Sequence, residues 1–295
     1  MAGVKEIKNR ISGVQDTRKI TNAMYLIAST KLRKAREELE GTRPYFNALR
    51  GEIKRIFRSV ESIESRYFFP PHEEFLDDEE WGCLVITADK GLAGSYNHNV
   101  LRSCEELLKR HPKTRLYVIG EFGRQYFSRK NIAVEPDFFF SAQDPSIDRA
   151  RTMASILMDR YDRGEIRKLY IVYTDLENSL SVATKVSRLL PLHKDHFFRP
   201  EDEQDVYSPF EFVPSPGAVL DAVVPSYVSG YIYSALVDSF CCEQNERMRA
   251  MDSANQNAEK ILDKLSIEYN RVRQGAITGE IIEISAGARA QKHSK

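Results

Sequence analysis

Long apolar runs and recognisable cysteine patterns are missing from this 295-residue chain. It contains no stretch of about 18 apolar residues, the length needed for a transmembrane helix. Residues 1–6 carry neither the apolar segment of a secretory signal nor the arginine-rich character of a transit peptide. Four cysteines form no secretory framework, and Cys241 and Cys242 are adjacent instead of following CxxC spacing. We therefore expect buried, reduced thiols in a chain that stays in the cytoplasm, or arrives as a mature form, and does not itself span a membrane.

The chain also lacks a net charge, because 43 Lys and Arg residues balance 43 Asp and Glu residues. This balance predicts binding neither to nucleic acid nor to an anionic membrane. The charges are nevertheless unevenly placed. Residues 1–58 carry 14 basic and 6 acidic side chains, whereas residues 211–295 carry 9 and 11. The two ends of the chain should therefore attract one another.

Proline, which lacks an N–H and disrupts helices, is absent from residues 1–43 and 226–295. In the first of these segments, residues suited to a contact face recur at steps of three or four. The predicted stripe consists of Val4, Ile7, Ile11, Val14, Thr17, Ile20, Met24, Ile27, Lys31, Ala35 and Leu39. This pattern predicts a long helix with one narrow contact face. We expect Gly41 and Pro44 to bend or weaken it.

The last segment repeats this design with a step near 3.5 residues, which is typical of a coiled-coil seam. The stripe comprises Tyr231, Ala235, Asp238, Cys242, Asn245, Met248, Met251, Asn255, Ala258, Leu262, Leu265, Tyr269, Val272 and Ala276. A helix over about 216–286 would be roughly 100 Å long. We expect it to pair with the N-terminal helix, and the polar seam positions Asp238, Asn245 and Asn255 to fix the register of the pair.

Short apolar runs alternate with helical patterns in the middle of the chain, which predicts a mainly parallel sheet covered by helices. Strands are expected at 82–88, 115–120 and 168–173, and helices at about 98–110, 121–130 and 146–163. The expected fold class is therefore α/β, with a long antiparallel coiled coil and a Rossmann-like domain. The expected divisions are a helix at 1–60, the α/β domain at 75–200 and a C-terminal helix at 210–288 that pairs with 1–60. Residues 193–215 look like a linker.

Candidate catalytic and metal-binding patterns are weak. The loop at 89–97 lies where α/β domains bind phosphate, but it lacks the third glycine of GxGxxG and the GK[ST] of a P-loop, so a tight turn is favoured. His193 and His196 could form a metal pair, but no third ligand is evident. The acidic run at 73–80 lacks the glycine turn and ligand spacing of an EF-hand. Residues 5–36 form a basic face on which a protein partner is favoured over DNA or lipid.

Motifs at both ends and in the middle of the chain resemble those of the gamma subunit of F-type ATP synthases. The matching stretches are residues 5–11, 19–24, 28–35, 87–97, 168–173, 189–192 and 269–288. They follow the family's order over the whole chain. Asn22 stands where a lysine is common, and Gly275 and Gly279 interrupt the closing helix at a cost of roughly 1 kcal/mol each relative to alanine.

The resemblance implies a non-catalytic rotor of a proton-translocating ATP synthase, which couples ion flow through the membrane ring to the cycle of the catalytic beta subunits. The implied partners are the alpha and beta subunits of the hexameric head, the epsilon subunit and the membrane c-ring, with no nucleic acid or small-molecule substrate. The implied beta-subunit contacts are Met24, Arg273, Gln274, Thr278 and Glu280. No catalytic residue, cofactor or metal is implied, and the implied location is peripheral, on the cytoplasmic face of a bacterial cell membrane.

Two alternatives remain open at this point. A nucleotide-dependent α/β enzyme would rest on residues 82–97, and a coiled-coil scaffold or DNA clamp would rest on the basic N-terminal face.

Overall fold

The computed structural model describes residues 2–59, 65–68, 80–176, 182–193, 197 and 212–293. Within them, the elements in chain order are α1 (Ala2–Ser59), β1 (Trp81–Ile86), α2 (Tyr96–Arg110), β2 (Thr114–Ile119), α3 (Glu121–Arg129), α4 (Ile147–Asp162), β3 (Lys168–Leu176), β4 (Val182–Leu190) and α5 (Pro216–His293). Two compact units result, Met1–Ser29 with Arg247–Lys295 and, separately, Thr30–Glu246. Among the described helices, none is both long enough and apolar enough to cross a membrane.

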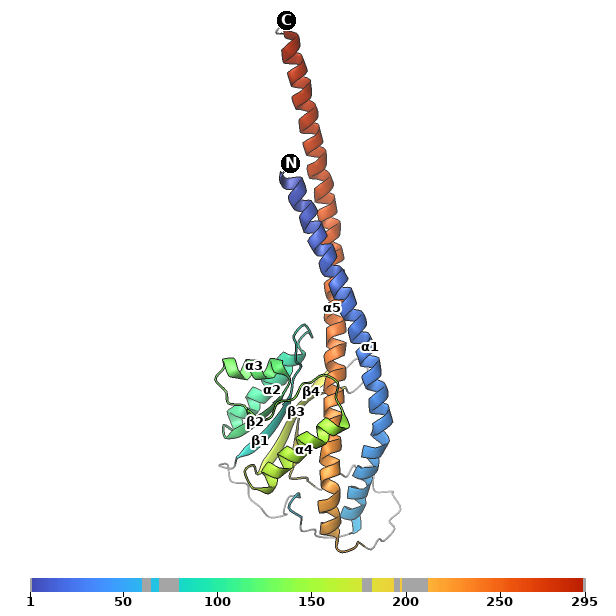
Figure 1. Cartoon of the computed structure of the whole chain (residues 1–295), viewed down its shortest axis with the longest axis vertical. Helices are drawn as coiled ribbons and strands as arrows, with labels where there is room; N and C mark the ends of the chain where they lie inside the picture. Colours follow the sequence, from blue (N-terminus) through green and yellow to red (C-terminus); the bar gives the residue numbers. More distant parts are fainter. Residues whose placement is uncertain are drawn as a thin grey trace. The chain divides into compact units, whose positions relative to one another are not determined.

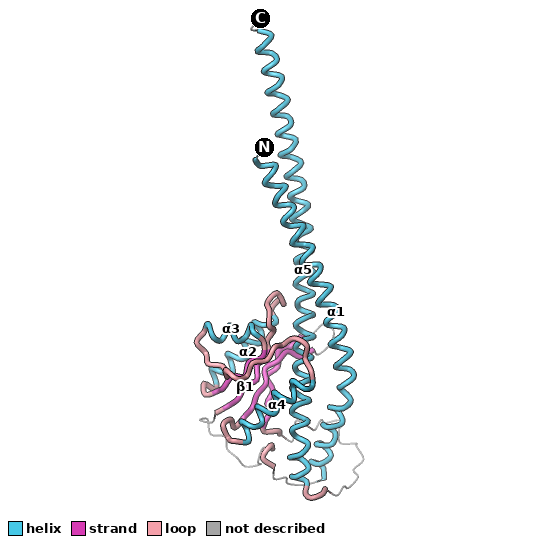
Figure 2. Tube along the Cα trace, in the orientation of Figure 1, coloured by secondary structure: helices cyan, strands magenta, loops and turns pink. Residues whose placement is uncertain are grey.

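The strands form one sheet in the order β2-β1-β3-β4. Figure 1 labels the four strands, and Figure 2 draws them in magenta. β1 pairs in parallel with both β2 and β3, which confirms the predicted mainly parallel sheet. β4 pairs antiparallel with β3 at the edge of the sheet and was not predicted. Its sequence lacks a continuous apolar run because much of the strand is only half-buried, so its composition does not resemble that of a central strand.

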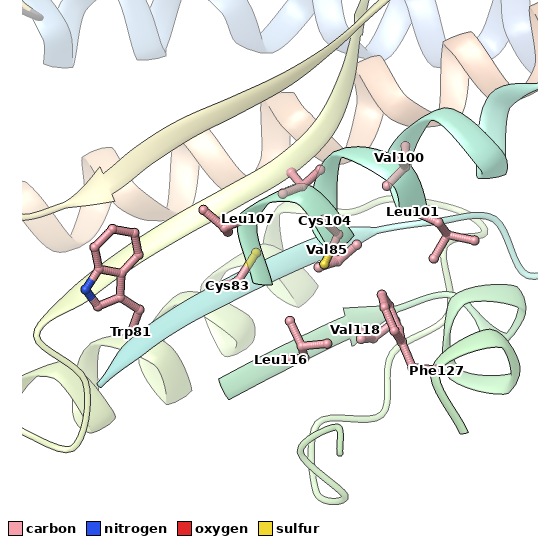
Figure 3. Close-up of a cluster of buried hydrophobic side chains, with 11 residues drawn as sticks. Trp81, Cys83, Val85, Val100, Leu101, Cys104, Leu107, Leu116, Val118 and Phe127 are labelled. Carbon is pink, nitrogen blue, oxygen red and sulfur yellow. The ribbon is translucent and has the colours of Figure 1, made fainter. Parts of the chain in front are cut away.

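A compact apolar core fills the space between the sheet and α2 and α3 (Figure 3). It contains Trp81, Cys83, Val85, Val100, Leu101, Cys104, Leu107, Leu116, Val118, Phe127 and Val172. Side chains alternate along β1, so Cys83 and Val85 point into this core while Leu84 and Ile86 are buried on the other face. All four cysteines are free and buried, which confirms the prediction of reduced, buried thiols.

In the Thr30–Glu246 unit, the helix pair has an apolar and aromatic interface. Pro44 lies inside α1, yet the helix continues without a break to Ser59, so the expected weakening at Gly41 and Pro44 does not interrupt it. Packing explains this continuity, because Phe46 sits directly against α5. A Cβ added at Gly230 would come within 2.0 Å of the Phe46 ring, so only glycine permits this close approach.

In the other unit, α1 and α5 run antiparallel along a thin seam. Thr21 donates a hydrogen bond to the Asn255 side chain, and an Arg18 guanidinium nitrogen lies 3.6 Å from a Glu259 carboxylate oxygen. The buried side chains that the structure describes in this unit are Ala28, Met251, Ala258 and Leu265. The predicted α5 stripe from Met251 onward matches the less exposed positions of the helix.

The predicted α1 stripe is wrong at Thr17, Ile20 and Ile27. Ile20 and Ile27, placed on the predicted seam, are 62% and 58% exposed, and Thr17 is exposed as well. Steps of four and three from Val14 instead reach Arg18, Thr21, Tyr25, Ala28, Leu32 and Ala35. The strict heptad therefore continues through a polar layer. The isoleucines misled the prediction because apolar character alone does not distinguish a seam residue from an exposed one.

Candidate functional site: the projecting end of α5

The C-terminal part of α5 runs beyond the start of α1 within the unit that these parts share. A Cβ added at Gly3 would lie 3.9 Å from Cγ1 of Val272, which places the first turn of α1 beside Val272. α5 continues past this level, and Figure 1 shows its red end extending beyond the N-terminus. The side chains of residues 273–289 are exposed apart from half-buried Ala276. We call residues 273–289 the projecting segment.

Four isoleucines give the projecting segment an unusual apolar surface. Ile277, Ile281, Ile282 and Ile284 are 48%, 58%, 62% and 73% exposed. Steps of four and three residues bring Ile277, Ile281 and Ile284 to one helix face. Gathered apolar side chains on a protein surface mark contact with another protein. The sequence analysis missed these residues, although it contained a signal for them, because the predicted stripe passes through Ala276 and leaves all four outside it.

Four of the predicted contact residues lie in the projecting segment and are exposed. Arg273 and Glu280 stand four residues before and three residues after Ile277, so they share its face. The Thr278 hydroxyl donates to the Gln274 carbonyl oxygen over 2.9 Å, which holds the threonine side chain along the helix. The structure thus brings these four polar residues together beside the isoleucines. Their contact with a beta subunit stays a prediction.

Met24 lies elsewhere. The hydrogen bond from Thr21 to Asn255 fixes the level of α1 against α5, so Met24 stands about one turn before Asn255 along α5. The helical rise of about 1.5 Å per residue then separates it from Arg273 by roughly 30 Å. Its side chain is half-buried. The five predicted contact residues therefore lie at two separate positions in this unit and do not form a single site.

The loop at 89–97 is held by its own carboxylate. Asp89 Oδ1 accepts hydrogen bonds from the backbone N–H groups of Glu121, at 3.1 Å, and Ala142, at 3.2 Å. Its Oδ2 accepts from the Ser141 hydroxyl at 2.6 Å. Glu121 is the first residue of α3, so the Asp89 carboxylate ties the loop after β1 to the N-terminus of that helix. This arrangement favours the structural turn over the nucleotide site.

The proposed metal patterns gain no support from the described residues, among which no group of three or more His, Cys, Asp or Glu side chains could hold an ion. His193 is described, but His196 and residues 73–79 lie outside the described part of the chain. Glu80, the last residue of the acidic run, pairs with Arg115 at 2.7 Å. Its carboxylate therefore joins the start of β1 to β2.

Several cations of the basic face at 5–36 have partners within the protein. Arg18 pairs with Glu259, as described above, and the Lys31 ammonium donates to the Gln143 side chain over 2.8 Å. These contacts favour the interpretation that part of this face binds the protein's own polar groups.

Comparison with known proteins decides the family. A chain of the Euglena gracilis mitochondrial ATP synthase, from a structure titled OSCP/F1/c-ring, aligns with a TM-score of 0.68 at 16% identity, covering 98% of this chain and 95% of that one. The profile of the ATP synthase family matches residues 3–291. The ATP synthase gamma chain of Caldanaerobacter subterraneus subsp. tengcongensis is 40% identical, over 97% of this chain and 99% of the relative.

The chain belongs to the ATP synthase gamma-chain family. A second gamma chain, from Acetobacterium woodii and described as sodium ion specific, is 35% identical over 97% of this chain and 98% of its own length. Membership confirms the resemblance carried by the terminal motifs. It also confirms the interpretation of the chain as a non-catalytic subunit of the ATP synthase complex over that of a nucleotide-dependent enzyme.

Proposed function

We propose that this gamma chain couples ion flow to ATP synthesis by pressing the projecting segment of α5 against the beta subunits of the catalytic head. The observation that carries the proposal is the row of exposed isoleucines on a helix that continues past its partner. Solvated helix faces are ordinarily polar, so this row needs a protein surface to cover it. As the shaft turns, each of three equivalent partners meets a different face of one asymmetric helix and is biased toward a different state.

The polar residues of the projecting segment would set the orientation of this contact. Arg273 and Glu280 carry opposite charges on the face of Ile277, so they can pair with complementary charges on a beta-subunit lever. Gln274 and Thr278 lie on the adjoining face and offer hydrogen-bonding groups. Met24 would act at a separate level, as a bearing contact of α1 against the same head. This assignment follows the family resemblance and, for the four residues of the projecting segment, the exposure of their side chains.

The partners proposed beyond the alpha and beta subunits are the epsilon subunit and the membrane c-ring. The titles of the structural relatives name a central stalk with its c-ring and a rotor, which supports the c-ring as a partner. The epsilon subunit follows from the family resemblance. We place the chain at the cytoplasmic face of the cell membrane, held there through these partners. The absence of a membrane-spanning helix from the described residues is compatible with peripheral attachment.

Reconstitution with alpha and beta subunits tests the proposal. The purified chain should hydrolyse no ATP alone and should stimulate turnover when mixed with the two subunits. Replacing Ile277, Ile281 and Ile284 together by serine should leave assembly intact and lower the ions pumped per ATP hydrolysed in membrane vesicles severalfold. Val213→Ser, at a position that is 83% exposed, is the control and should change nothing. Unchanged pumping in the triple variant would refute the contact, and failure of the full chain to assemble would refute the role.

A further inference from the structure

A candidate binding cavity lies in the Thr30–Glu246 unit, which does not contain the projecting segment. A cavity of about 460 Å³ opens between α1, the β3–β4 pair and α5. Its polar lining comprises Arg50, Arg188, Ser187 and the tyrosines Tyr170, Tyr227 and Tyr231. Carboxylates are absent from the described residues that line it. The volume falls within the range of about 300–1,000 Å³ typical of pockets for small organic molecules.

The absence of carboxylates from its described lining distinguishes this cavity from another one in the same unit. Another cavity in the same unit, of about 420 Å³, is lined by one arginine, Arg151, and by the two aspartates Asp159 and Asp162. There the acidic side chains outnumber the basic one. Arg50 and Arg188 both line the first cavity, and the fork of N–H donors on a guanidinium group matches the paired oxygens of a phosphate or a carboxylate. The cavity is therefore suited to an anion, whereas its neighbour is not.

Local structure holds the two arginines next to tyrosine rings. Tyr170 pairs with Arg188 across the β3–β4 ladder, and a register shift after Leu169 leaves Leu189 as an extra residue in β4. Such a bulge turns neighbouring side chains away from regular alternation and is frequent beside binding sites. The Arg188 charge opposes the burial that raises the pKa of Tyr170. The Arg188 side chain thus acts electrostatically on the ring that shares its cavity wall.

The opposite wall is an array of rings on α5. Tyr227 and Tyr231 lie with ring centroids 6.4 Å apart, and the hydroxyls of Tyr231 and Tyr173 approach to 3.4 Å. Burial and Tyr231 raise the pKa of Tyr227 to about 12, while the charge of Arg50 opposes them. Arg50 and Tyr227 therefore repeat, on the helical wall, the arginine–tyrosine pairing of the strand wall. Rigid rings of this kind offer faces on which a planar ligand can stack.

We propose that this cavity binds a small organic anion, a phosphate or a carboxylate carried on an aromatic ring. The oxyanion lies between the guanidinium groups of Arg50 and Arg188, and the ring packs on the tyrosines. This site is separate from the contact proposed for the projecting segment. Because α1, the sheet and α5 each contribute one wall, a bound anion would link these three elements within the unit.

Calorimetric titration of the full-length chain tests the proposal with four probes. ADP represents a phosphate joined through a sugar to an aromatic base, and salicylate represents an aromatic carboxylate. Adenosine lacks the phosphate of ADP, and inorganic phosphate lacks its aromatic base. We expect ADP or salicylate to bind, and to bind more tightly than adenosine and inorganic phosphate. The preferred member of the pair identifies the oxyanion. No heat with either at millimolar concentration would overturn the proposal, as would adenosine or phosphate binding as tightly as the better probe.

Variants assign the binding to the two arginines. Arg50→Gln and Arg188→Gln should each raise the dissociation constant about tenfold or more, since each removes a charge-assisted contact. Arg50→Lys keeps the charge but loses the fork, and should give a smaller increase. Arg151→Gln, in the other cavity, is the matched control and should have no effect. Circular dichroism on each variant establishes that it is folded, and undiminished binding by a folded Arg50→Gln chain would place the anion elsewhere.

Discussion

Two stretches of the same helix, α5, are stabilised in different ways. From Leu220 to Gln244 the helix buries side chains on most of its circumference, including Val224, Val228, Ile232, Val237, Phe240, Cys241 and Cys242. From Arg247 to Arg289 the described buried side chains are Met251, Ala258 and Leu265. The first stretch is a core helix, and the second has a single narrow seam. A narrow seam leaves most of the helix surface available to other proteins.

This difference indicates that one stretch of α5 stabilises the fold while the other is available to contact partner proteins. Apolar side chains in the first stretch face the protein's own core, whereas Ile277, Ile281 and Ile284 in the second are solvent-exposed. The free energy of folding should therefore depend on the first stretch and the contact with partners on the second. The following predictions test this division.

The largest expected effect is from Ile232→Ala, because Ile232 is completely buried. Removal of such a side chain leaves a cavity, and we expect it to lower the free energy of unfolding by about 4 kcal/mol. Leu265→Ala, at a seam position that is 4% exposed, should cost about 2 kcal/mol, since a thin seam can close over the lost volume more easily. Hydrogen exchange of each unit, read together with urea unfolding, measures both. Equal costs would show that the seam is as firmly packed as the core.

The pH dependence of the first stretch should come from Asp238. Burial, with a contribution from Asp175, raises its pKa to about 7, against the opposing influence of Arg43, Ser234 and Lys185. In the unfolded chain this carboxyl has a pKa of about 3.9, the value of a free aspartate. Between these values the folded chain holds a proton that the unfolded chain has lost. Stability therefore decreases as pH rises through this window and levels off above it.

Asp238→Asn should remove that slope. We expect the advantage of the variant over the original chain in free energy of unfolding to increase by roughly 2 kcal/mol as the pH rises from about 4 to about 8. Urea unfolding at several pH values measures this gain. Asp159→Asn is the control, since Asp159 is half-exposed and pairs with Arg163 on the surface of α4. A gain of the same size in the control, or none in Asp238→Asn, would contradict the assignment.

Replacement of glycine by alanine should change the free energy of unfolding in opposite directions in the two stretches of α5. An added Cβ at Gly275 meets no atom within 4 Å, so Gly275→Ala should stabilise the helix by about 1 kcal/mol through helix propensity alone. Gly230→Ala should destabilise the chain, because its Cβ would clash with Phe46. Local hydrogen exchange in α5 compares the two. A stabilising Gly230→Ala would show that the Phe46 ring moves aside easily.

The smallest effect is expected on the seam surface. Arg18 and Glu259 are paired at 3.6 Å, but their side chains are 46% and 62% exposed. Solvent screening should hold their coupling energy to about 0.5 kcal/mol or less, and added salt should reduce it further. A double-mutant cycle with Arg18→Gln and Glu259→Gln measures this coupling energy. A larger coupling would indicate that the polar layer of the seam is more rigid than its exposure suggests.

Much of the fold followed from sequence periodicity, for physical reasons. The apolar runs that became β1, β2 and β3 are buried, so their composition reflects their position. β4 escaped prediction because an edge strand tolerates polar residues such as Lys185 and Arg188. The helix at 1–60 was predicted, but the sequence could not show how it tolerates Pro44, since Phe46 packs against a glycine far along the chain.

The site was less predictable than the fold. Family motifs supplied Arg273, Gln274, Thr278 and Glu280, whereas the exposed isoleucines could be recognised only by their positions outside the predicted stripe. Their exposure also depends on where the neighbouring helix begins, and the first turn of α1 lies beside Val272. Ile20 was placed on the wrong face for another reason, because an apolar side chain within the paired region can still be exposed. Periodicity identifies a helix and its stripe, whereas the length of the partner determines which residues remain uncovered.

The carboxylate of Asp89 has a mechanical consequence for this domain. Because it belongs to the loop after β1 and accepts a hydrogen bond from the first N–H of α3, it holds that loop against the helix with a covalently attached group. Its three hydrogen bonds join the loop after β1 to α3 and to the chain at Ser141 and Ala142. A part used elsewhere for ligand recognition here serves as an internal brace.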